Sequence, residues 1–82
     1  METGQPWTRF GKVVKDLRTE HKLTQAELAI ASGVDQTTIS LLERGQRQPT
    51  LRTLYGLSAA LDLRLVELIG LLEDDSGDVE AD

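Results

Sequence analysis

Cysteine is absent from this chain, and histidine occurs only once. Without cysteine the chain can form neither a disulfide nor a zinc site with thiolate ligands. The single histidine, His21, cannot build a metal cluster, and no serine or aspartate is placed by a motif to work with it in catalysis. The sequence also lacks a glycine-rich phosphate loop and a nucleophile motif. We therefore expect neither an enzyme nor a bound cofactor.

Long apolar runs are also missing. No stretch approaches the roughly 20 residues that a helix needs to cross a bilayer. The opening residues, METGQPW, have neither the basic nor the apolar region of a signal peptide. These two features predict a cytoplasmic protein.

The chain is short, with 82 residues and no internal repeat. This length corresponds to one small domain, whose hydrophobic core is only marginally sufficient for stability. Because neither disulfides nor a thiolate metal site can add stability, we expect packing and dimerisation to supply it.

Acidic residues outnumber basic ones by 14 to 9, which gives a net charge of -5. Such a balance argues against nucleic acid as a partner, because phosphate binding normally requires a basic surface. The distribution reverses this conclusion. The stretch from Trp7 to Arg52 contains eight Lys or Arg against five acids, a net charge of +3. The field at a bound phosphate depends on this local balance rather than on the total.

The rest of the chain is strongly acidic. From Thr53 onward, Arg64 stands alone against eight acids, a net charge of -7. The stretch from Glu73 to Asp82 carries most of them. It is either a solvated tail or a segment that weakens non-specific DNA binding or meets a basic partner.

The segment from Thr24 to Arg44 has the pattern of two short helices joined by a turn. Thr24 and Glu27 have the spacing of a capping box, which satisfies free amides at the start of a helix. Gly33 can take the left-handed conformation that closes a helix, and Asp35 can cap the next one. A turn of about three residues therefore connects the two helices, as in a helix-turn-helix.

This helix pair has two distinct faces. The inner face is apolar and consists of Leu28, Ala29, Val34, Ile39 and Leu42. The free face of the second helix of the pair carries Gln36, Thr37, Ser40 and Leu41. These side chains offer small uncharged donors and acceptors together with one apolar group, which suit the edges of base pairs. The free face is therefore a candidate for contact with DNA bases.

Two further helices flank this pair. Apolar residues at steps of three and four predict a helix from Trp7 to about Lys22, with His21 in its last turn near the negative end of the dipole. Gly45 ends the third predicted helix, which is the second helix of the pair. The residues GQRQP that follow form a loop, because Pro49 disfavours helical geometry in the residue before it. Thr50 can then cap a fourth helix, whose apolar positions are Leu51, Leu54, Leu57 and Leu61. Gly56 inside it costs about 1 kcal/mol relative to alanine, which indicates a close helix contact.

The last predicted element is open to two interpretations. Asp62 can cap a fifth helix that runs to about Leu72, with Gly70 as a weak point. The segment LDLRLVEL also alternates between apolar and polar residues, so an edge strand made from Leu61, Leu63 and Leu65 is the alternative. The pattern leaves residues 61–68 undecided between helix and strand.

A specific set of motifs runs from about Phe10 to Ile69. It consists of Arg18, LTQAELA at 23–29, SGV at 32–34, and TIS..ERG..QPTL ending at Leu51. On these residues the chain resembles the lambda-repressor or Cro-type helix-turn-helix regulators, also called the XRE family. The resemblance implies an all-α fold of five helices, with the third helix in the DNA major groove and the second crossing the backbone. The expected organisation is a disordered segment at 1–6, a DNA-binding and dimerisation domain at 7–72, and an acidic disordered tail at 73–82.

The resemblance also assigns roles to single residues. Gln36, Thr37, Ser40 and Leu41 correspond to the base-reading positions, where glutamine can pair bidentately with adenine. Leu41 departs from the polar residue often found at its position, so its expected contact is a thymine methyl group. Gln25, at the start of the second helix, is similar to the family's residue that binds a DNA phosphate, and the free amides at that helix start would assist it. The other phosphate-binding candidates are Thr38, Arg44, Gln46 and Arg47.

Arg18 and Glu43 have a different implied role. In the family the matching pair is a mostly buried ion pair that ties the first helix to the third. Removing one partner of such a pair costs about 3 to 5 kcal/mol. We interpret both residues as scaffold rather than site.

Apolar residues remain after the helix stripes are assigned: Tyr55, Val66, Ile69, Leu71 and Leu72. A patch of this kind on a small protein usually marks an interface, although the residues could also complete the core, as we expect for Leu68. We assign Val66, Ile69 and Leu72 to the interface of a homodimer. Its two third helices, about 34 Å apart, would face successive major-groove turns of a roughly palindromic operator.

These inferences favour a sequence-specific transcriptional regulator that binds double-stranded DNA as a homodimer. Such a compact regulator is similar to the controller proteins of restriction-modification systems and to small phage Cro-like repressors, and the sequence does not choose between them. Whether it represses or activates depends on the position of its operator. The alternative is an antitoxin that neutralises a toxin and autorepresses its operon. The acidic tail and the alternating LDLRLVEL motivate it, since a flexible segment can fold onto a partner.

Overall fold

The computed structural model describes residues 6–76, with side chains described for residues 7–71. It contains five helices: α1 (Pro6–Glu20), α2 (Gln25–Ser32), α3 (Gln36–Glu43), α4 (Leu51–Ala60) and α5 (Leu65–Ser76). Because residues 6–76 contain no strand, the all-α prediction is confirmed. The predictions for residues 1–5 and 77–82 lie outside the described part of the chain.

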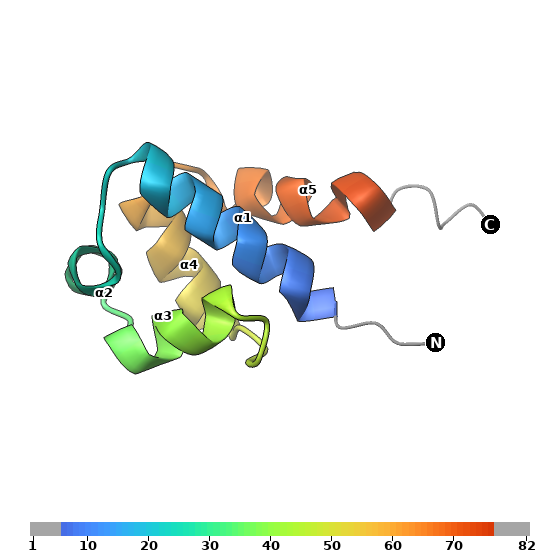
Figure 1. Cartoon of the computed structure of the whole chain (residues 1–82). Coiled ribbons are helices and arrows are strands. Elements are labelled where there is room, and N and C mark those ends of the chain that lie inside the picture. The colour runs from blue at the N-terminus through green and yellow to red at the C-terminus, as the bar shows by residue number, and fades with distance from the viewer. Residues whose placement is uncertain (1–5, 77–82) are drawn as a thin grey trace.

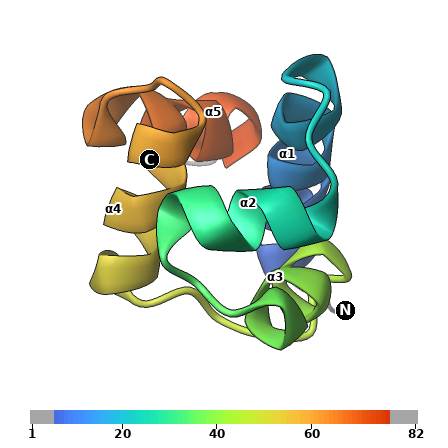
Figure 2. The same ribbon diagram turned by 90° about the vertical axis from the view of Figure 1, so that its left-hand side faces the viewer.

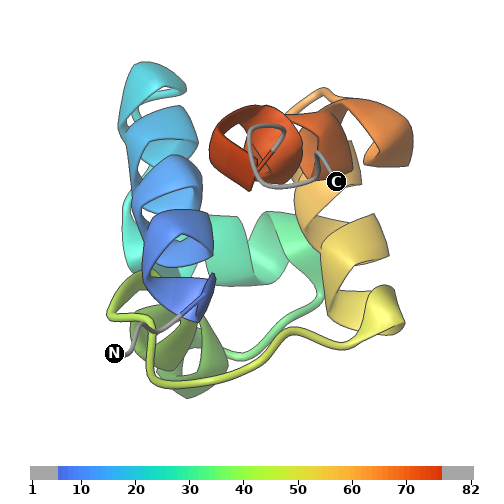
Figure 3. The same cartoon turned by 90° about the vertical axis from the view of Figure 1, so that its right-hand side faces the viewer.

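The helices pack into a small bundle in which α2 lies across one side, between α1 and α4 (Figure 2). Helix α2 contacts both α3 and α4, and α1 contacts both α3 and α5. The third and fifth helices lie at opposite ends of the molecule, as Figure 1 and Figure 3 also show. The outer surface of α3 is therefore well separated from that of α5.

A single hydrophobic core holds the bundle together, and every helix contributes to it. Its fully buried side chains are Phe10, Val14, Leu28, Ile39, Leu42, Leu57, Leu61 and Leu68. Burying an aliphatic or aromatic side chain of this kind contributes about 1.5 to 3 kcal/mol. Ala29 and Val34 pack partly buried against the same core, so the predicted inner face of the helix pair is confirmed. The assignment of Leu68 to the core is confirmed as well.

The prediction for the start of the fifth helix is wrong. Asp62 does not cap α5: it has a positive φ of 61° in the turn after α4, and the helix begins only at Leu65. The N–H of Leu63 donates to the carbonyl of Ser58 at 2.8 Å, which closes α4, and Glu67 Oε1 accepts from the N–H of Arg64 at 2.8 Å. The alternating segment thus contains a helix end, a turn and a helix start, and the edge strand is wrong.

Other helix boundaries differ by a few residues. Helix α1 starts at Pro6, a residue well suited to a first turn because it lacks the amide hydrogen that would stay unpaired there. It ends at Glu20 rather than near Lys22, which has a positive φ of 59°. Helix α5 continues to Ser76, beyond the boundary drawn at Leu72.

One apolar stripe is also shorter than predicted. Leu57 and Leu61 are buried and Leu54 is partly buried, but Leu51 is 63% exposed. Leu51 is the first residue of α4, and this first turn extends beyond the core.

Candidate nucleic-acid interface

The junction between α2 and α3 has the caps that the sequence predicts. The hydroxyl of Thr24 accepts from the N–H of Glu27 at 3.0 Å, and the Glu27 carboxylate accepts from the N–H of Thr24 at 2.8 Å. Gly33 has a φ of 74° and ends α2, a left-handed conformation that costs glycine little. Asp35 then caps α3 by accepting from the N–H of Thr38 at 3.0 Å. These local bonds fix where α3 begins and therefore which of its residues face outward.

The outward face of α3 carries most of the predicted base-reading residues. Gln36 and Thr37 are exposed in the first turn, and Ser40 is half-buried one turn later. Together with Gln25 and Arg44 they line a shallow surface hollow of about 270 Å³. Leu41 is half-buried and does not line this hollow. The structure therefore brings Gln25, from the start of α2, to the same surface as the first turns of α3.

Arg18 and Glu43 form a bidentate ion pair between α1 and α3. Arg18 Nε donates to Glu43 Oε2 at 2.6 Å, and Arg18 Nη2 donates to Glu43 Oε1 at 3.1 Å. The two side chains are only 12% and 4% exposed, and Arg18 also donates to the carbonyl of Leu23 at 2.9 Å. The hydrogen bond with Glu43 raises the pKa of the Arg18 guanidinium above its ordinary value. A bidentate pair of this kind fixes the angle between the two helices as well as their distance.

Gln25 has a partner that the sequence did not reveal. Its Nε2 donates to Glu43 Oε1 at 3.0 Å, across 18 positions of sequence. The buried carboxylate of Glu43, on α3, therefore accepts hydrogen bonds from Arg18 of α1 and from Gln25 of α2. Sequence patterns carry no signal for this bond, because the spacing of Gln25 and Glu43 has no periodic meaning.

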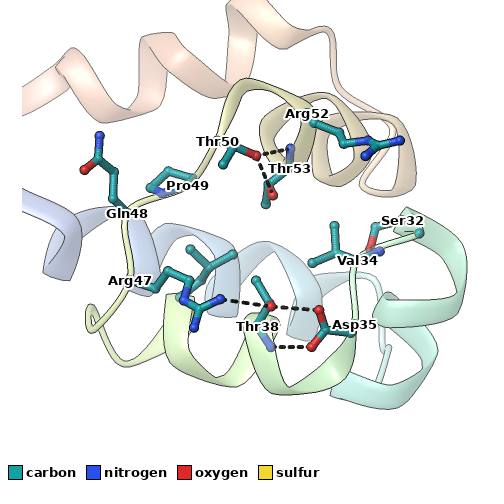
Figure 4. Close-up of a pocket in the computed structure, with 12 residues that line it drawn as sticks. Ser32, Val34, Asp35, Thr38, Arg47, Gln48, Pro49, Thr50, Arg52 and Thr53 are labelled. Atoms are coloured by element: carbon teal, nitrogen blue, oxygen red, sulfur yellow. Dashed lines mark hydrogen bonds between the residues drawn. The ribbon is translucent and has the colours of Figure 1, made fainter.

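A second polar network joins α3 to the loop that follows it (Figure 4). The Thr38 hydroxyl donates to Asp35 Oδ1 at 2.8 Å and accepts from Arg47 Nη1 at 3.4 Å. Hydrogen bonds from the Thr38 hydroxyl and amide, with the positive charge of Arg47 nearby, lower the pKa of Asp35. Both Thr38 and Arg47, predicted as phosphate-binding residues, are thus linked to each other beside the start of α3.

The same network borders a pocket of about 580 Å³ between the two helix starts, α3 and α4 (Figure 4). Its lining adds three polar residues that sequence reasoning missed: Gln48, Arg52 and Thr53. Arg52 could have been found from the sequence, because it lies in the first turn of α4, directly after the loop that carries Arg47. Gln46 is exposed in this loop and does not line the pocket.

The predicted dimer residues lie on a different surface. Val66 is 62% exposed, Ile69 is half-buried, and the side chain of Leu72 lies outside the described residues. Val66 and Ile69 line an open apolar groove of about 610 Å³ between α4 and α5, which also includes Tyr55, itself 61% exposed.

None of the described helices combines the length and apolar character that a membrane crossing requires. Comparison with known proteins identifies relatives that have a helix-turn-helix. Residues 14–68 match the family model of the helix-turn-helix family HTH_3. The chain is also 51% identical over 53 residues to the HTH-type transcriptional regulator y4dJ of Sinorhizobium fredii, a match that covers 65% of this chain and 69% of that protein.

Two solved structures share the arrangement of helices. The restriction-modification controller protein C.AhdI from Aeromonas hydrophila is 39% identical, with a TM-score of 0.72 over 76% of this chain and 94% of its own. The controller protein C.Esp1396I, solved as a tetramer in complex with its natural 35 base-pair operator, is 29% identical. Its TM-score is 0.76, over 89% of this chain and 96% of its own. The chain therefore belongs to the XRE-type family of helix-turn-helix transcriptional regulators.

Proposed function

We propose that this protein binds a specific DNA operator as a homodimer, with α3 of each copy in the major groove. The observation that carries the proposal is the outward face of α3. Gln36 and Thr37 are exposed in its first turn, and Ser40 follows one turn later. All three are uncharged and offer donors and acceptors, so they can discriminate base edges without binding every sequence through charge.

Phosphate contacts would come from residues on both sides of this face. Arg44 follows α3 directly and lines the hollow with Gln36, whereas Arg47 lies at the other pocket, in the loop before α4. Gln25 would approach the backbone from the start of α2. Contacts of this kind hold a protein on the duplex and set its register, while base contacts supply the specificity.

A homodimer would explain the exposed apolar groove between α4 and α5. Tyr55 and Val66 are each more than half exposed, and a second copy of the chain can cover both. We propose that Leu72 joins Val66 and Ile69 in this interface. Two copies related by a twofold axis present the same residues to two half-sites, so the operator should be roughly palindromic.

This proposal assigns no catalytic activity to the chain, and it keeps the expected cytoplasmic location. The antitoxin hypothesis receives no support from the three relatives, so we do not extend it. C.Esp1396I, the relative whose structure contains DNA, is bound to an operator, which agrees with the proposed ligand.

Selection of bound duplexes from random DNA tests the proposal directly. We expect enrichment of a motif with twofold symmetry, whose half-sites are centred about 10 base pairs apart or a multiple of this. The selection should be repeated at two salt concentrations, because non-specific binding falls steeply with salt while base readout persists. If no sequence is enriched over the starting pool at either salt concentration, the proposal is wrong.

A further inference from the structure

The side-chain amide of Gln25 is held by a buried carboxylate. Its Nε2 donates to Glu43 Oε1 at 3.0 Å, and the Glu43 side chain is only 4% exposed. Gln25 is the first residue of α2, and Glu43 is the last residue of α3. The bond therefore connects the start of one helix of the DNA-binding pair to the end of the other.

This bond decides which way the amide points. An ionised carboxylate can only accept hydrogen bonds, so it must face the Nε2 of Gln25 and not its carbonyl oxygen. A freely exposed glutamine samples both orientations and several rotamers, and it loses that freedom only when it binds a ligand. Gln25 is thus oriented before DNA arrives, with its second Nε2 hydrogen left for another acceptor.

Arg18 makes this arrangement compatible with a nearby phosphate. Glu43 Oε1 accepts from Arg18 Nη2 at 3.1 Å as well as from Gln25, and Arg18 Nε bonds the other carboxylate oxygen. Without the guanidinium, a carboxylate next to Gln25 would repel an incoming phosphate. The ion pair with Arg18 neutralises the charge of Glu43, and the Glu43 carboxylate still accepts the hydrogen bond from the Gln25 amide.

The hollow beside Gln25 places the oriented amide next to the proposed base-reading face. Gln25 lines it together with Gln36, Thr37, Ser40 and Arg44, so the amide stands at the edge of the proposed base-reading face. A donor at this edge is placed to meet the backbone of a strand whose bases are contacted by α3.

We propose that Glu43 is a positioning residue for DNA binding, which acts by orienting the Gln25 amide to donate to a phosphodiester oxygen. The inference rests on the proposed operator binding. It gives the Arg18–Glu43 pair a second role besides joining α1 to α3.

A double-mutant cycle separates this role from a purely structural one. Operator affinity and thermal unfolding are measured for the wild type, Gln25→Ala, Glu43→Gln and the double variant, with a duplex from the selection above. Gln25→Ala should weaken binding roughly tenfold, as expected for a lost hydrogen bond to a charged group. Glu43→Gln should also weaken binding in the wild-type background, but it should have no further effect in the Gln25→Ala background. It should lower the unfolding temperature in both backgrounds, because its bonds to Arg18 do not involve Gln25.

Val14→Ala serves as the matched control. Val14 is buried in the core on α1 and takes no part in the hydrogen bonds of Gln25, Arg18 and Glu43. The smaller side chain leaves a cavity, so this variant should lower the unfolding temperature and leave operator affinity unchanged at a temperature where the protein is fully folded.

A measurement on the unaltered protein covers the case in which Glu43→Gln does not fold. The side-chain amide hydrogens of Gln25 should exchange with solvent more slowly than those of Gln46, which is exposed. Three results would each overturn the inference. They are equal exchange rates for the side-chain amides of Gln25 and Gln46, an operator affinity that Gln25→Ala leaves unchanged, and a loss of operator affinity on Glu43→Gln that is equal in both backgrounds. These results would leave the proposed function intact as long as the wild type prefers its operator to random DNA. Loss of that preference would overturn both.

Discussion

Gly56 of α4 lies directly against the carbonyl oxygen of Ser32 at the end of α2. A Cβ atom at position 56 would overlap this oxygen and would also approach Cγ2 of Val34 to 3.6 Å. The absence of a side chain therefore allows α2 and α4 to approach each other at the turn that leads into α3. Gly70 of α5 provides a contrast, because a Cβ there would meet nothing within 4 Å.

The two glycines should respond in opposite ways to alanine. Gly56→Ala gains about 1 kcal/mol of helix propensity but forces α2 and α4 apart, and overpacking of this kind typically costs about 1 to 3 kcal/mol. We expect a net loss of stability for Gly56→Ala and a gain of about 0.5 to 1 kcal/mol for Gly70→Ala. Chemical denaturation of both variants measures the difference. Equal effects at the two positions would show that the close approach at Gly56 carries no cost.

Gln36 and Arg44 should differ in what they contribute to DNA binding. Gln36→Ala should remove about 1 to 3 kcal/mol of discrimination at one base pair, because it deletes a base contact. Arg44→Ala should weaken binding to all sequences alike and reduce its dependence on salt, because it deletes a charge near phosphate. Titrations with operator and random duplexes at several salt concentrations distinguish the two. A loss for Gln36→Ala that is equal on operator and random DNA would contradict the base-reading role.

Val66→Glu should dissociate the proposed dimer. The substitution places a charge in the apolar groove between α4 and α5, where a second copy would have to bury it without a partner. Sedimentation analysis over a range of concentrations should show the variant as a monomer under conditions in which the wild type is dimeric. Ile30→Glu is the matched control, since Ile30 is 84% exposed but lies on α2. A wild type that remains monomeric at high concentration would contradict the dimer, and equal effects of the two variants would place the interface elsewhere.

Asp35 should make stability depend on pH in the acidic range. Its pKa is lowered in the folded state, first by the hydrogen bond from the Thr38 hydroxyl. A carboxylate with a lowered pKa adds stability above its unfolded pKa of about 3.9 and loses that contribution as the pH falls through the folded pKa. Asp35→Asn keeps a good N-cap but removes the titration.

The test compares unfolding temperatures of the wild type and Asp35→Asn from pH 7 down to pH 3. The wild type should have its largest advantage at neutral pH, and this advantage should shrink below about pH 4. Other carboxylates titrate in both proteins and cancel in the difference. A difference that stays constant over this range would mean that Asp35 titrates alike in the folded and unfolded chain.

Features set by neighbours in the chain could be predicted from the sequence. Thr24, Gly33 and Asp35 satisfy or adapt backbone groups no more than four positions away, so their residue types alone indicate where α2 begins and ends and where α3 begins. The outward face of α3 follows from these caps and the helical repeat. The fifth helix shows the limit of this reasoning. Asp62 is a good capping residue, but the chain closes α4 through Leu63 and Ser58 first, so the helix start is delayed to Leu65.

The sequence by itself determined the helix pair, its apolar inner face and its polar outer face, because hydrogen bonds and periodicity over one or two turns encode them. The family resemblance already implied that Arg18 pairs with Glu43, but only the tertiary structure decided that Gln25 shares this partner. Gln25 lies 18 positions and Arg18 lies 25 positions from Glu43, and the three residues meet because α1, α2 and α3 pack on one core. Leu51 is exposed for a related reason: its helical position is apolar, but the core does not extend that far along α4. Contacts of this kind depend on where whole helices come to rest, which no local pattern specifies.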